Sequence, residues 1–123
     1  MILRTLMIAA AVNLTLLGNA GAESKGPNGG IVVKVDDHPV EFVVRGQEIV
    51  FYLGDHDGKP LSTKGLKARA VVQDGGKTIT VALSPAPPNM FGGKLAAPLG
   101  AKARVVFSSI FDGHSLQARF VAP

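Results

Sequence analysis

Beyond residue 30 the chain alternates short apolar runs with clusters of glycine, proline, asparagine and aspartate, at a spacing of about ten residues. Within most runs the apolar side chains occupy every second position, which is the period of a half-buried strand. This pattern predicts eight strands, at residues 31–35, 40–44, 48–53, 67–73, 78–84, 90–95, 101–110 and 115–121. We therefore expect an all-β fold, a single immunoglobulin-like antiparallel β-sandwich of about 7–8 short strands.

Glycine-containing turns predict how some of these strands pair. Gly46 at the first central position of a two-residue loop suits a type II′ hairpin, while Gly75-Gly76 and Asp112-Gly113 suit type I′ hairpins. The Gly46 turn sets a register that pairs inward-facing residues with one another: Val44 with Ile49, Phe42 with Phe51, and Val40 with Leu53. A slip of one residue would turn a whole apolar set outward, so this register is strongly favoured.

Extended further, the same register places His38 opposite Asp55 and Asp37 opposite His56. Two imidazoles and four carboxylates then gather at one end of a hairpin. Imidazole nitrogen together with carboxylate oxygen suits Zn²⁺, Cu²⁺ or Ni²⁺. The sequence thus gives a candidate metal site made of His38, His56, Asp55, Asp57, Asp37 and Asp36.

The same residues also have an ordinary structural interpretation. Aspartate side chains bind backbone amides two residues on, and Gly58 and Pro60 favour a turn. In the predicted register, moreover, His38 and His56 point to opposite faces, so both reach one ion only if the ladder ends early. A polar turn and a metal site therefore remain two open interpretations.

Residues 1–22 have the layout of a secretory signal peptide, with Arg4, an apolar run, and small residues at Ala20 and Ala22. A retained membrane anchor is the alternative, but the run is interrupted and shorter than the ~20 apolar residues of a spanning helix. Cleavage after Ala22 would leave a flexible lead-in at residues 23–30 and a β-sandwich domain at residues 31–123. We expect export to the periplasm without membrane insertion of the mature chain; secretion into the medium is the alternative destination.

Composition narrows the function classes. The chain has no cysteine, so it lacks disulfides, thiolate ligands and thiol catalysis. Its serines lack the G-x-S-x-G elbow, and we expect no enzyme. The formal charge is a mild +4, and the basic stretch of Lys64, Lys67 and Arg69 has no interleaved aromatic residue, so we expect no nucleic-acid binding. His114, after a hairpin glycine, is interpreted as a solvated turn residue.

The order of four motifs resembles a known class of exported domain: PNGGIVV at residues 27–33, HPVEFVV at 38–44, FYLGDHDGKPLSTKGLKARAVV at 51–72 and GAKARVVFSSIFDGHSLQARF at 100–120. The chain resembles small β-sandwich domains found alone or near the N-terminus of periplasmic adaptor subunits of heavy-metal efflux pumps of the resistance-nodulation-division class. The resemblance implies a non-enzymatic periplasmic domain linked to metal handling. Asn28 differs from metal-associated relatives, which often have histidine before the paired glycines.

Two functional hypotheses follow. The first is a periplasmic accessory or binding domain for heavy-metal handling or efflux, which binds a divalent ion through the His/Asp cluster and has an efflux component or another envelope protein as partner. The alternative is a metal-independent interaction module of the cell envelope. Its docking patch would be Val43, Val50 and Tyr52, which interrupt the otherwise polar outer face of the first hairpin. Burial under another strand or the N-terminal segment is the competing fate of these three residues.

Overall fold

The computed structural model describes residues 23–111 and 113–123. The regular secondary structure of these residues consists entirely of β-strands. The predicted signal peptide at residues 1–22 lies outside the described residues. None of the described residues belongs to a helix long and apolar enough to cross a membrane. In chain order the strands are β1 (Glu23–Lys25), β2 (Ile31–Val35), β3 (His38–Arg45), β4 (Glu48–Leu53), β5 (Ala68–Asp74), β6 (Lys77–Ala86), β7 (Met90–Lys94), β8 (Arg104–Phe111) and β9 (His114–Val121).

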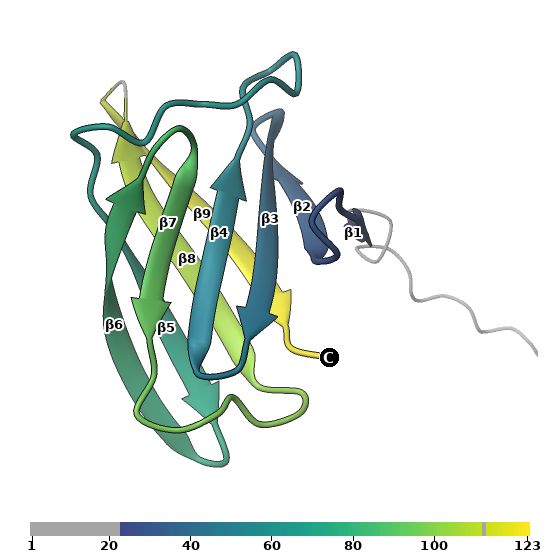
Figure 1. Ribbon diagram of the computed structural model, residues 1–123, viewed down its shortest axis with the longest axis vertical. Coiled ribbons are helices and arrows are strands. Elements are labelled where there is room, and N and C mark those ends of the chain that lie inside the picture. The colour runs from purple at the N-terminus through teal and green to yellow at the C-terminus, as the bar shows by residue number, and fades with distance from the viewer. Residues whose placement is uncertain (1–22, 112) are drawn as a thin grey trace, which may run out of the picture.

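In this part of the chain the strands form one antiparallel sheet of nine, in the order β1-β2-β3-β4-β7-β6-β5-β8-β9. The sheet curls, so that β3, β4 and β7 lie in front of β5, β8 and β9 (Figure 1). Strand β6 makes the corner, because residues 77–83 pair with β5 and residues 84–86 pair with β7. The predicted all-β antiparallel class is confirmed, while a division into two immunoglobulin-like sheets stays a prediction.

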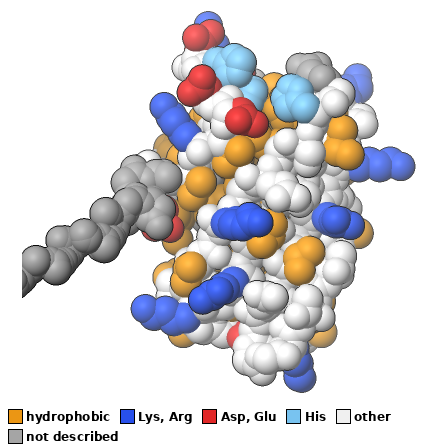
Figure 2. Space-filling view, turned by 180° about the vertical axis from the view of Figure 1, so that it is seen from behind, with side chains coloured by type: hydrophobic (Ala, Val, Ile, Leu, Met, Phe, Trp, Pro, Cys, Tyr) orange, Lys and Arg blue, Asp and Glu red, His pale blue; other side chains and the backbone are white. Residues whose placement is uncertain are grey.

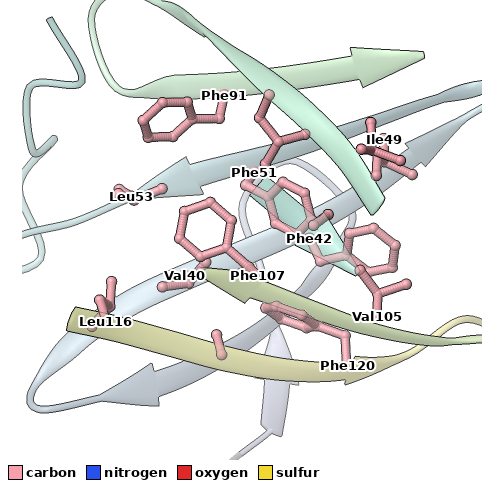
Figure 3. Close-up of a cluster of buried hydrophobic side chains, with 14 of the residues drawn as sticks. Val40, Phe42, Ile49, Phe51, Leu53, Phe91, Val105, Phe107, Leu116 and Phe120 are labelled. Carbon is pink, nitrogen blue, oxygen red and sulfur yellow. The ribbon is translucent and has the colours of Figure 1, made fainter. Parts of the chain in front are cut away.

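Five phenylalanines fill the space between the two halves of the curled sheet (Figure 3). The Phe51 ring from β4 lies 4.8 Å, between centroids, from the Phe107 ring of β8, and Phe42 of β3 lies 5.2 Å from Phe120 of β9. Burying one such side chain contributes about 1.5–3 kcal/mol. The facing aromatic rings therefore hold the halves together without a disulfide.

The predicted register of the β3–β4 hairpin is confirmed from Arg45↔Glu48 to Val40↔Leu53. Gly46 has φ of 62°, as the first position of a type II′ turn requires. Gly75 and Gly76, at 58° and 85°, are both positive, as in a type I′ turn. These backbone angles suit glycine, so the turn residues fix which strands pair and in which register.

Strand boundaries follow the sequence closely in some places and less so in others. β2 and β4 have the predicted bounds, whereas β8 begins at Arg104 and not at residue 101. Lys102 there has φ of 65°, and the amide of Ala103 donates to the carbonyl of Gly100 at 3.3 Å. A turn therefore occupies residues 100–103, which the apolar pattern alone does not reveal.

Residues 23–30, for which the sequence predicts a flexible lead-in, form β1 and a hydrogen-bonded turn packed on the sheet. Glu41 of β3, only 4% exposed, holds this turn. The amides of Asn28 and Gly30 donate to Glu41 Oε2 at 2.9 and 2.8 Å, and Asn28 Nδ2 donates to Oε1 at 2.9 Å. Both oxygens of a buried carboxylate are thereby satisfied.

Two glycines allow this close approach of the N-terminal turn. A Cβ on Gly26 would collide with the Glu41 carboxyl, and one on Gly30 would collide with the backbone carbonyl of Phe42. The glycines of the segment therefore serve packing as well as turn formation. The glycine-rich composition of residues 23–30 is typical of a linker. The Glu41 carboxylate that orders the turn is more than ten residues away in the sequence, so the local pattern does not reveal it.

Candidate metal-binding site

His38 is positioned by a turn that the sequence analysis did not single out. Strands β2 and β3 are joined through Asp36 and Asp37, which have φ of 50° and 65°, and Val35 pairs with His38. Positive φ at both central residues is the type I′ geometry, and aspartate tolerates it better than most residues. The turn places His38 at the start of β3, where its side chain is 7% exposed.

The hydrogen bonding of His38 shows that one particular ring nitrogen carries a proton. Its Nδ1 lies 3.0 Å from the backbone carbonyl oxygen of Gly54. Because a carbonyl only accepts, Nδ1 must carry the proton and donate. In the neutral imidazole the other nitrogen, Nε2, then keeps its lone pair.

The segment after Gly54 is a polar turn, as one of the two interpretations of the sequence holds. Asp55 Oδ1 accepts from the amides of Asp57 and Lys59, each at 2.9 Å, and the Asp55 amide donates to the Lys59 carbonyl at 2.7 Å. Gly58, with φ of 81°, completes the turn, and Gly54 pairs with Pro60. The Asp55 carboxylate thus orders its own loop.

This turn overturns one detail of the predicted register. The last backbone hydrogen bond between the two segments is the Gly54 amide donating to the Pro39 carbonyl at 2.9 Å. His38 therefore does not pair with Asp55, and Asp37 does not pair with His56, because the chain after Gly54 folds back on itself and Gly54 pairs with Pro60. The ladder ends early.

The early end of the ladder brings the two histidines together. The ring centroids of His38 and His56 lie 4.4 Å apart, with an angle of 40° between the ring planes. In the regular register they would point to opposite faces. The expectation that the Gly46 hairpin brings His38 and His56 side by side is therefore confirmed, by a different local geometry.

The carboxylates of the predicted set lie on the two turns that carry His38 and His56, and among the described residues they form no group with the two rings that could hold a metal ion. Asp36, Asp37 and Asp57 are exposed, and Asp55 is half-buried in its turn. Within residues 23–111 and 113–123, no three histidine, aspartate or glutamate side chains form a group that could hold a metal ion. Of the six predicted ligands, the structure thus offers two imidazoles and an acidic rim, a name we use for Asp36, Asp37, Asp55 and Asp57.

The third histidine, His114, lies at the same end of the molecule. The sequence pattern did not predict this position. Phe111 contacts both His38 and His114, with ring centroids 5.1 Å apart in each case. Figure 2 shows the histidines and several carboxylates gathered at this end. Only the strand order β5-β8-β9 across the curl brings the β8–β9 hairpin here, and a lone sequence does not predict that order.

The docking patch of the alternative hypothesis, made of Val43, Val50 and Tyr52, is mostly buried. Val43 and Val50 are 7% and 1% exposed, so burial was the correct one of the two predicted fates. Tyr52 is half-buried, and its hydroxyl accepts from Arg45 Nη2 at 2.9 Å. These three side chains therefore offer no apolar face to a partner.

Comparison of the chain with protein-family models, with curated proteins and with solved structures finds no significant match in any of the three. The resemblance to efflux adaptor domains therefore stays a prediction.

Proposed function

We propose that this protein is a periplasmic, non-enzymatic binding domain for heavy-metal handling, which captures a divalent transition metal ion through His38 and His56. The observation that carries the proposal is the combination of two adjacent imidazole rings with a fixed tautomer of His38. Zn²⁺, Cu²⁺ and Ni²⁺ are the fitting ions, since imidazole is a ligand that all three favour.

The spacing of the rings supports this assignment. Two imidazoles that share one tetrahedral ion hold their ring centroids about 5 Å apart, because each nitrogen lies about 2 Å from the metal. The 4.4 Å separation of His38 and His56 is close to that value. His56 is exposed, so its ring can turn toward an ion held by His38.

The bond from His38 to Gly54 supports the proposal independently. Histidines that bind metals almost always donate their other ring N–H to a carbonyl, a carboxylate or water, which orients the ring and raises its basicity. His38 makes this bond through Nδ1, at 3.0 Å. Its Nε2 would then be the ligand, held in place before any ion arrives.

The acidic rim supplies the electrostatics. Its four carboxylates flank His38 and His56 in the chain, whereas Lys34 and Lys59 are the two basic residues that adjoin these turns, so the formal charge there is negative. Such a concentration of negative charge attracts a cation and repels anions. The rim would thus raise the local concentration of metal ions without supplying ligands.

Titration calorimetry tests the proposal with Zn²⁺, Cu²⁺ and Ni²⁺ in turn. We expect the wild-type protein to bind at least one of these ions, and the His38→Ala/His56→Ala double variant to give no heat. His114→Ala is the matched control, because it removes an exposed histidine from the same end and should retain wild-type affinity. No heat from the wild-type protein with any of the three ions would refute the proposal.

A further inference from the structure

The His38–His56 pair is an incomplete coordination site, and this inference rests on the function proposed above. Zn²⁺ in closed protein sites takes four ligands in a tetrahedron. The described residues offer two imidazole nitrogens, and they hold no group of three or more metal-ligating side chains at this end. Two positions on a captured ion would therefore be open.

Nearby groups of the same chain are poorly placed to fill the open positions. Asp55 Oδ1 already accepts two backbone hydrogen bonds, and withdrawing it would release the turn that carries His56. His114 contacts Phe111, as His38 does, with ring centroids 5.1 Å apart in both cases, and within the described residues it joins no group of three metal-ligating side chains. A molecule outside the chain can therefore supply the remaining ligands.

We propose that two copies of this chain share one ion, so that His38 and His56 of each copy complete a tetrahedron of four imidazoles. Two-fold symmetry needs only one kind of half-site, and it presents identical ligands from both sides. His38 and His56 lie at the β2–β3 turn and the turn after β4. Histidine side chains gather at one extremity of the molecule, where a second copy can approach end to end (Figure 2).

The acidic rim makes this association depend on the metal. In an end-to-end dimer the rims of both copies face each other, and like charges at short range repel. A divalent cation between them offsets that repulsion and binds both copies. The metal-free protein should therefore be monomeric, and the dimer should form only when the ion is present.

Sedimentation velocity of the purified protein, with Zn²⁺ added stepwise, tests the inference. We expect a monomer in chelator, a dimer at one ion per two chains, and a return to monomer in excess Zn²⁺, because each copy then takes its own ion. His56→Ala should remain monomeric throughout, whereas His114→Ala should behave as the wild type does.

The outcomes separate this inference from the proposed function. A monomer that binds one ion per chain would overturn the shared site and leave metal capture standing. Failure to bind Zn²⁺ in parallel calorimetry would overturn both. A dimer that persists in chelator, or that forms equally well in His56→Ala, would show that the interface does not use these histidines and would also overturn the inference.

Discussion

Two buried polar side chains of β3, Glu41 and His38, differ in how much of their hydrogen-bonding capacity the fold uses. Glu41 is 4% exposed, and both of its oxygens accept hydrogen bonds from the N-terminal turn. His38 is 7% exposed, and only its Nδ1 is engaged, by the Gly54 carbonyl. The first residue has a structural role alone, whereas the second combines a structural bond with a nitrogen suited to a ligand.

The partners of the two residues differ in origin as well. Glu41 receives donors from Asn28 and Gly30, which lie in one neighbouring turn. His38 contacts Gly54 and His56 in the turn after β4, and Phe111 at the end of β8, so its partners come from two distant parts of the chain. A residue at the meeting point of several segments is well placed to form a binding site.

The largest loss of stability is expected from Glu41→Ala. The variant leaves the Asn28 and Gly30 amides without their charged acceptor, so the free energy of unfolding should fall by about 3 kcal/mol. Urea denaturation measures this loss. The exposed Glu23 is the matched control, and Glu23→Ala should cost less than about 0.5 kcal/mol. Equal effects of the two variants would contradict the structural role of Glu41.

A somewhat smaller loss, about 2 kcal/mol, is expected from His38→Ala, because the Gly54 carbonyl loses its donor and Phe111 loses a packing neighbour. Metal binding should disappear at the same time. His38→Phe retains a ring against Phe111 but no nitrogen, so calorimetry should again detect no metal. A His38→Phe protein that binds Zn²⁺ as the wild type does would remove His38 from the site.

Asn28→Ala should cost about 1 kcal/mol, since it removes only the side-chain donor and leaves the backbone amides of the turn in place. Metal affinity should not change, because Asn28 donates its hydrogen bonds to Glu41 and not to His38 or His56. Denaturation and calorimetry on the same sample measure both quantities. A stability loss as large as that of Glu41→Ala would assign the whole contact to the asparagine side chain.

The smallest effect on stability is expected from His56→Ala, less than about 0.5 kcal/mol, because this side chain is exposed. The loss of metal affinity in this variant, by contrast, should be large. Affinity should fall by more than ~10-fold, the lower end of the loss caused by removing only an outer-shell partner. An unchanged affinity would mean that His38 acts without its neighbour.

Much of the fold could be predicted because alternation and turn chemistry act locally. The Gly46 hairpin shows this well: glycine at a positive φ and the facing pairs Phe42↔Phe51 and Val40↔Leu53 determine one register. β1 could not be predicted, because the turn that returns the chain from β1 to β2 is held by the Glu41 carboxylate of another strand. The order in which the hairpins join across the curled sheet likewise depends on contacts between distant segments.

The candidate site was predictable in part for the same reason. The β3–β4 register brings the segments of His38 and His56 together, and the structure confirms their proximity. The expected pairing of His38 with Asp55 was wrong, because the Asp55 carboxylate binds the amides of its own loop and ends the ladder. His114 was missed, since its position at this end follows from the strand order alone.

The nitrogen NMR spectrum of the histidine rings tests the central claim most directly. Our account predicts that the neutral His38 ring is protonated at Nδ1, that its Nε2 has the chemical shift of an unprotonated nitrogen, and that adding Zn²⁺ shifts Nε2 of His38 and a nitrogen of His56 together. A His38 ring protonated at Nε2, or ring nitrogens that do not respond to Zn²⁺, Cu²⁺ or Ni²⁺, would contradict it.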